Sequence, residues 1–130
     1  MLDATRAPMA AMTMVGGDHF FLDRWVRYYG DQLGRENLYV FSHGGDPRHH
    51  DIAEGCNIIY LPFDPTRYCF NQRRWQMLSR VTTGLTHFYN WVLVSDVDEI
   101  VAVDPAAADG LLDYLGRFDP KSTPDRKSVV

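Results

Sequence analysis

The sequence predicts an α/β protein with a mostly parallel sheet that is flanked by helices. Two observations carry this prediction. Apolar runs of strand length alternate with segments of helical periodicity, and the runs are nearly continuous, which is typical of strands covered on both faces. With 130 residues, of which 45% are hydrophobic, the chain is also long enough to bury the core of one domain.

The first half of the chain predicts a strand, a helix and two more strands. The apolar run at 8–17 ends in two glycines and is the first expected strand. A helix is expected from Asp18, a candidate N-cap residue, to Gly34. One face of this helix carries the recurring apolar side chains, which are Leu22, Val26, Tyr29 and Leu33. Short strands are expected at 37–47 and 57–63, with a polar loop between them.

The second half predicts one further helix and one further strand. A helix is expected from Asn71, with Gly84 as its stop signal, and a strand follows at 91–95. The expected apolar face of this helix consists of Trp75, Leu78, Val81 and Thr82. This alternation favours parallel strands joined by right-handed crossovers. The domain is expected to span 1–118, with a polar and non-native tail over 119–130.

Three segments follow expected strands, and the topology brings them to one edge of the sheet. Ligands of open parallel sheets bind beyond the carboxyl ends of the strands, which here are the segments 15–18, 42–46 and 95–99. The last segment contains Asp96, Asp98 and Glu99.

These acids indicate a site for a metal diphosphate. Side chains alternate along a strand, so Asp96 and Asp98 are expected to point the same way into one small volume. Two carboxylates there repel each other, and a divalent cation removes the conflict. Oxygen ligands suit Mg²⁺ or Mn²⁺, and Mg²⁺ in particular keeps waters and recruits substrate phosphates. The alternative is that both acids are simply solvated at the end of a strand.

The residues around these acids carry a resemblance. The segment WVLVSDVDEIV resembles the metal-binding segment of family 2-like glycosyltransferases with the GT-A fold, in the branch whose signature contains Asp-x-Asp-Glu. The segment MVGGDHFFLDRWVRYYGDQLG is similar to that branch's Asn-Glu loop and the helix after it. The two matches cover most of 8–118. The resemblance implies a Rossmann-like GT-A fold, incomplete at the C-terminus, that transfers a sugar with inversion from a nucleotide-diphosphate donor to an unknown glycan or other hydroxyl acceptor.

The resemblance also implies roles for single residues. Asp98 would be the direct metal ligand of the Asp-x-Asp pair, and Glu99 would orient the loop. Asp18 and Asp46 match acids that follow the family's first and second strands, whereas Gly17 replaces the expected Asn. The predicted nucleotide-binding residues are Val15, Gly17, Asp18, Asp46, Arg73 and Asp96, and the predicted metal ligands, for Mn²⁺ or Mg²⁺, are Asp96 and Asp98. No general base is identifiable.

Two groups leave alternatives open. Arg73 and Arg80 share a helix face that could approach a diphosphate, although exposed helical arginines commonly only solvate a face. The segment HGGDPRHHD, at 43–51, gathers three histidines and two aspartates that could form a transition-metal site. Because it lacks fixed ligand spacing, a solvated loop is the favoured interpretation.

Composition limits the partners. Seventeen acidic and thirteen basic residues give a net charge of -4, with no Lys/Arg cluster, so nucleic acid is not an expected partner. No window holds about 18 consecutive apolar residues, and the N-terminus lacks the apolar stretch of a signal peptide. We therefore expect a cytoplasmic chain without a membrane segment, and bacterial envelope assembly is a family-level expectation. The terminal DRKSVV resembles translated sequencing adapter, which favours a truncated transferase.

Two other functions stay open. Haloacid-dehalogenase-type phosphohydrolases also use Asp-x-Asp after an apolar strand, with the first Asp as nucleophile. Their motif follows the first strand and has Thr or Val two places after the second Asp, where this chain has Ile100. A non-catalytic module that binds a nucleotide sugar is compatible with all the residues above, and metal-dependent binding without turnover would distinguish it from a transferase.

Overall fold

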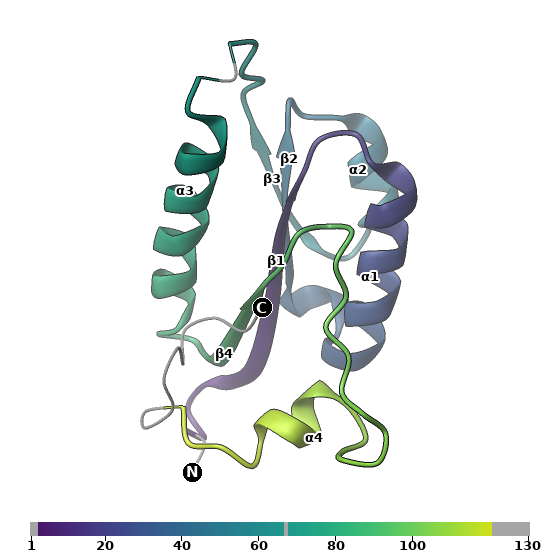
Figure 1. Ribbon diagram of the computed structural model, residues 1–130, viewed down its shortest axis with the longest axis vertical. Helices are drawn as coiled ribbons and strands as arrows, with labels where there is room; N and C mark the ends of the chain where they lie inside the picture. The colour runs from purple at the N-terminus through teal and green to yellow at the C-terminus, as the bar shows by residue number, and fades with distance from the viewer. Residues whose placement is uncertain (1–2, 67, 121–130) are drawn as a thin grey trace.

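A computed structural model describes residues 3–66 and 68–120 of the chain. Four parallel strands form one sheet in the order β3-β2-β1-β4 (Figure 1). The strands are β1 (Ala7–Val15), β2 (Leu38–His43), β3 (Asn57–Leu61) and β4 (Tyr89–Val94). The predicted α/β class and parallel sheet are confirmed. Most of the predicted tail, at 121–130, lies outside the described residues.

Helices cover both faces of the sheet. Helices α1 (His19–Leu33) and α2 (Pro47–Ile52) lie on one face, and α3 (Phe70–Leu85) lies on the other (Figure 1). A short 3₁₀ helix, η1 (Arg35–Asn37), leads into β2, and α4 (Leu111–Leu115) contacts α1. The chain runs outward from β1 to β3 and then returns to place β4 on the other side of β1, so the strand order reverses between β1 and β4.

The core consists of two layers, and β1 contributes to both because its side chains alternate between the faces. Met9, Ala11 and Val15 pack with the α1 side, whereas Ala10, Met12 and Met14 pack with the α3 side. Helix α1 buries the predicted apolar face together with Trp25. All six residues of β4 are buried, which fits the continuous apolar pattern of its sequence.

Helix α2 replaces the predicted solvated loop. Asp46 is its N-cap residue, and the Asp46 carboxylate accepts a hydrogen bond from the Arg48 backbone N–H at 2.9 Å. Pro47 occupies the first helical position, where a missing N–H costs nothing. His49 is fully buried. The second strand ends at residue 43, before α2, and the third strand also ends earlier than predicted, at residue 61.

The predicted apolar face of α3 is only partly right. Leu78 and Thr82 are buried, and Val81 packs at the edge of the core. Trp75, however, is 54% exposed. The helix rests on the sheet through a narrow stripe, and Trp75 lies outside it.

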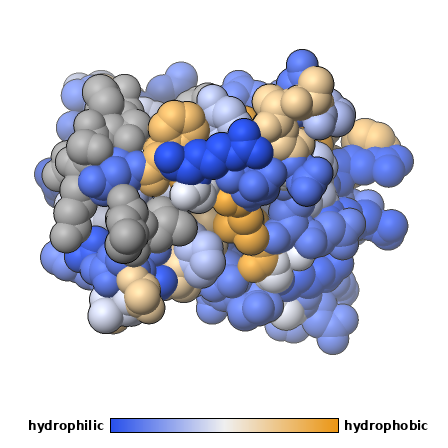
Figure 2. Space-filling view, turned by 90° about the horizontal axis from the view of Figure 1, so that it is seen from below, coloured by the Kyte–Doolittle hydropathy of each residue, from blue (hydrophilic) through white to orange (hydrophobic). Residues whose placement is uncertain are grey.

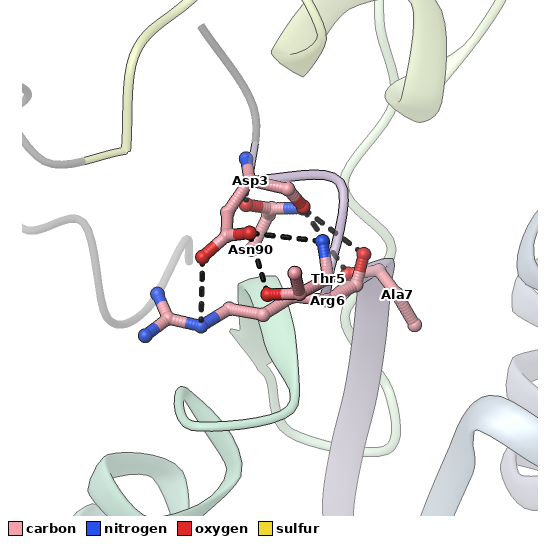
Figure 3. Close-up of polar contacts among 5 residues, drawn as sticks. All are labelled: Asp3, Thr5, Arg6, Ala7 and Asn90. Atoms are coloured by element: carbon pink, nitrogen blue, oxygen red, sulfur yellow. Dashed lines mark hydrogen bonds and ion pairs between the residues drawn. The ribbon is translucent and has the colours of Figure 1, made fainter.

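A polar network attaches the chain before β1 to β4 (Figure 3). The Asn90 side-chain amide donates to the Asp3 carbonyl at 3.0 Å, and the Asp3 N–H donates to Asn90 Oδ1 at 2.9 Å. The Asp3 carboxylate accepts from both the N–H and the hydroxyl of Thr5. The buried Asn90 side chain therefore has partners at its oxygen and its nitrogen, as a structural polar group should.

This network lies at the end of the sheet opposite the carboxyl ends of the strands. Figure 2 views the molecule from that end, where hydrophilic residues form most of the visible described surface and hydrophobic residues appear in small, separate groups. Among the described residues, no helix combines the length and the apolar character that crossing a bilayer requires.

Candidate functional site

The chain turns tightly after β4 and gathers three acids. The Glu99 N–H donates to the Asp96 carbonyl at 3.0 Å, which closes a turn over 96–99. One carboxylate oxygen each from Asp96, Asp98 and Glu99 lies within 4.8 Å of the others, and all three residues are exposed. We call residues 96–99 the acidic turn. Asp96 and Asp98 converge as predicted, but they do so on a turn, because β4 already ends at Val94.

Buried hydrogen bonds fix the entry to the acidic turn. The Thr13 hydroxyl donates to the Ser95 carbonyl at 2.8 Å, and Trp25 Nε1–H donates to Ser95 Oγ at 3.0 Å. Thr13 belongs to β1 and Trp25 to α1. The residue just before the acids is therefore held from two neighbouring elements.

Two tyrosines of α1 fix the exit. The Tyr28 hydroxyl donates to the Val101 carbonyl at 3.0 Å, and the Val101 N–H donates to the Tyr29 hydroxyl at 2.8 Å. Burial raises the pKa of Tyr29, so its hydroxyl stays neutral. The helical spacing placed Tyr29 on the apolar face of this helix but did not indicate either hydrogen bond to Val101. These hydrogen bonds could have been anticipated, because a buried Tyr hydroxyl or Trp indole N–H needs a hydrogen-bond partner.

Arg74 of α3 faces the acidic turn from the other side. Its Nη2 lies 2.7 Å from Asp96 Oδ1, and its side chain is 20% exposed. Asp98 and Glu99 form no ion pair with any residue among 3–66 and 68–120. Three carboxylates and one guanidinium carry a formal charge of -2 when all are ionised, so one divalent cation would balance this group.

Arg73, which the helical spacing singled out, has a different neighbour. Its guanidinium pairs with Asp64, in the loop between β3 and α3, at 2.5 Å. Arg80 is exposed and lines neither of the two cavities beside β1 and β2. Helical spacing alone could not choose between adjacent arginines, since the choice depends on which face of α3 meets the sheet.

A cleft opens at the carboxyl ends of β1 and β2. One cavity of about 430 Å³ is lined by Val15, Gly17 and Asp18, three of the predicted nucleotide-binding residues. An adjoining cavity of about 370 Å³ reaches Arg73. Both cavities share a set of lining residues, which are Met14, His43, Phe63, Phe70 and Arg74. Because Arg74 also pairs with Asp96, one lining residue of the cleft contacts the acidic turn.

Aromatic rings form one side of this cleft. The His43 ring lies 5.4 Å from the Phe63 ring and 5.0 Å from the Phe70 ring, centroid to centroid. His43 Nε2 accepts from the Asp64 N–H at 3.1 Å, so the neutral ring carries its proton on Nδ1. Phe63 is 62% exposed. Exposed ring faces of this kind can stack on a nucleobase.

Asp18 and Asp46 occupy different environments. Asp18 has left-handed backbone angles, φ 42° and ψ 45°, and its carboxylate has no partner among the described residues. Asp46 lines neither cavity of the cleft, and its carboxylate bonds to the His19 ring and the Arg48 N–H. These two hydrogen bonds, that of His19 first, lower the pKa of Asp46. His19, Asp46 and His49 form a second group of ligand atoms within 4.8 Å of one another.

The chain matches no protein-family model, no curated protein and no solved structure. Its function must therefore be inferred from the geometry of this edge of the sheet and from the residues that carry the resemblance.

Proposed function

We propose that this chain is the donor-binding part of a GT-A glycosyltransferase that transfers a sugar from a nucleotide-diphosphate donor to a hydroxyl acceptor. The acidic turn is the observation that carries the proposal. It presents three carboxylates from a fixed frame at the reversal of strand order between β1 and β4, where open α/β sheets bind ligands. The cleft beside it has a volume typical of small-molecule sites.

The donor set of the acidic turn fits Mn²⁺ or Mg²⁺. Its ligand atoms are all carboxylate oxygens, which such hard cations prefer, and their exposure leaves room for water and phosphate oxygens. Asp96 and Asp98 would hold the cation, and Glu99 lies within reach of it. A bound cation would neutralise charge on the leaving diphosphate. Arg74 adds a fixed positive charge on the cleft side of Asp96.

The cleft would receive the nucleoside and the phosphates. The His43, Phe63 and Phe70 rings offer stacking surface for the base, and the Asp18 carboxylate can accept hydrogen bonds from base or ribose. Gly17, at φ 67°, has no side chain to obstruct the approach of a ligand to the backbone beside Val15. Arg73 lines the adjoining cavity of the cleft. Asp46 lies outside the cleft and hydrogen-bonds to His19 at the start of α1.

Two observations argue against a phosphohydrolase of the haloacid-dehalogenase type. The acids follow β4 and not β1. Asp96, which would be the nucleophile, is paired with Arg74 at 2.7 Å. A nucleophilic carboxylate must be free to attack phosphorus.

Calorimetric titration of UDP and GDP, with and without Mn²⁺, tests the proposal. We expect binding of at least one diphosphate that requires both Mn²⁺ and Asp98 and is lost in Asp98→Ala. Asp31→Ala is the control, because it removes one negative charge from an exposed site on α1. Folded protein that binds neither diphosphate would refute the proposal. Metal-dependent binding without consumption of any sugar donor would indicate the non-catalytic binding module.

A further inference from the structure

His49 is buried, and both nitrogens of its ring have partners. Nε2 lies 2.6 Å from the Gly17 carbonyl oxygen, and Nδ1 lies 2.7 Å from Ser42 Oγ. A carbonyl oxygen only accepts, so in the neutral ring Nε2 carries the proton and Nδ1 accepts from the Ser42 hydroxyl. Ser42 Oγ in turn accepts from the Asp46 N–H at 3.1 Å. Each of these donors and acceptors is thus paired without a bound cation.

Asp46 extends this network to the start of α1. Its Oδ2 lies 2.6 Å from Nε2 of His19, the first residue of that helix. Helix α2 therefore holds the β1–α1 connection on both sides of Asp18, through the carbonyl of Gly17 and through the side chain of His19. We call this arrangement, formed by His19, Ser42, Asp46 and His49, the α2 clamp.

The residue between the two held positions is a strained one that faces the cleft. Asp18 has a left-handed backbone conformation, which residues other than glycine adopt only where their surroundings enforce it. Asp18 lines the cleft, and its carboxylate has no partner among the described residues. The clamp thus holds the backbone at Gly17 and His19, and the backbone between them sets the direction of the Asp18 side chain.

We propose that His49 is a positioning residue that directs the Asp18 carboxylate toward the nucleoside part of the ligand. It acts through the Gly17 carbonyl and touches no ligand itself. The inference rests on the proposed function in one respect, that the ligand is a nucleoside diphosphate. A carboxylate only accepts hydrogen bonds, so the groups it selects are ribose hydroxyls or base N–H groups.

Two substitutions of His49 distinguish its hydrogen bond to Gly17 from its hydrogen bond to Ser42. In His49→Gln the amide nitrogen can take the place of Nε2 and donate to Gly17, whereas in His49→Asn the shorter amide reaches only the position of Nδ1. We expect His49→Asn to weaken the binding of UDP or GDP with Mn²⁺ about tenfold, the factor for one lost hydrogen bond. His49→Gln should bind within about threefold of the wild type. His50→Asn, at an exposed neighbouring position, is the control.

A ligand-free measurement keeps this test separate from the proposed function. Nitrogen-15 NMR should show the Nε2–H tautomer of His49, and the Gly17 and Asp18 amides should exchange faster in His49→Asn than in His49→Gln. Mn²⁺ affinity should be the same in all variants, because the clamp does not contact the acidic turn. If the wild type binds Mn²⁺ but no diphosphate, the proposed function fails while these NMR results still decide whether the clamp exists.

Three results would overturn the inference. They are equal diphosphate affinities of the Gln and Asn variants, an Nδ1–H tautomer, and Zn²⁺ binding through His49 Nε2, which cannot both ligate a metal and donate to Gly17.

Discussion

Two clusters of titratable side chains lie at the same edge of the sheet, and they differ in where their partners are. In the α2 clamp, His49 and Asp46 find their hydrogen-bond partners inside the protein. In the acidic turn, three exposed carboxylates share one guanidinium, that of Arg74. Both clusters have the composition of a metal site. The groups of the clamp are thus satisfied within the chain, whereas the acidic turn keeps a net negative charge that an external cation could balance.

The acidic turn is open but not loosely held. Side-chain hydrogen bonds at Ser95 and at Val101 fix the chain on either side of it. Carboxylates that are held close together before a ligand arrives need little reorganisation to bind one. Substitutions in the clamp should mainly lower the stability of the fold and misplace Asp18. Substitutions of an acid in the acidic turn should mainly weaken metal binding.

The largest expected effect is on stability, in His49→Ala. The substitution leaves a cavity at a fully buried site and removes the partners of Ser42 and Gly17, so we expect a loss of about 2 to 4 kcal/mol in the free energy of unfolding. Urea titration measures it. His50→Ala should lose less than about 0.5 kcal/mol, because that side chain is exposed. Equal losses in the two variants would contradict a supporting role for the clamp.

Two buried tryptophans provide the next test, which concerns the frame of the acidic turn. Trp25 Nε1–H donates to Ser95, whereas Trp91 Nε1 has no partner among the described residues. Trp25→Phe should therefore destabilise the chain by about 1 to 2 kcal/mol more than Trp91→Phe, since only the first substitution removes a buried hydrogen bond. Chemical denaturation and Mn²⁺ titration of both variants measure the difference. Similar destabilisation and unchanged Mn²⁺ affinity in Trp25→Phe would refute the frame.

A smaller effect concerns acid stability. The His19 hydrogen bond, followed by that of the Arg48 N–H, lowers the pKa of Asp46 in the folded chain. Asp46 therefore contributes stability that is present above its unfolded pKa and is lost as the pH falls through the folded value. In His19→Phe this contribution should shrink, so the decline in stability below about pH 4 should be less steep than in the wild type. If the free energy of unfolding falls equally steeply with decreasing pH in the two proteins, His19 does not stabilise the ionised form of Asp46.

The smallest expected effect has the opposite sign. Asp98→Asn should slightly raise the thermal midpoint in metal-free buffer, because it relieves repulsion within the acidic turn. The gain should shrink at high salt, which screens exposed charges. Adding Mn²⁺ should raise the midpoint of the wild type but not that of the variant. A lower midpoint for the variant without metal would show that Asp98 is satisfied within the chain.

The sequence predicted the strands and α1 well, because their apolar patterns match what the sheet buries on both faces. Helix α2 was missed because six residues are too few to show periodicity, although Asp46-Pro47 is a recognisable helix start. Trp75 and Arg73 show a second limit. Spacing along α3 gives relative positions only, and the packed face is decided by tertiary contacts.

The candidate site was predictable in its acids but not in its support. The Asp-x-Asp spacing and the end of an apolar strand indicated where Asp96 and Asp98 converge. Their frame joins Thr13, Trp25 and Tyr28 to residues at least 70 positions away in the sequence. Such long-range hydrogen bonds follow from the folded arrangement and leave no local pattern.

Because both clusters could hold a metal, paramagnetic broadening of backbone amides by Mn²⁺ shows directly which of them binds the cation. We predict that substoichiometric Mn²⁺ broadens the amides at 95–101 first, and that adding the diphosphate extends the effect to 16–18. Broadening centred on His19, Asp46 and His49 instead would contradict the account, because it would show that the clamp, and not the acidic turn, is the metal site.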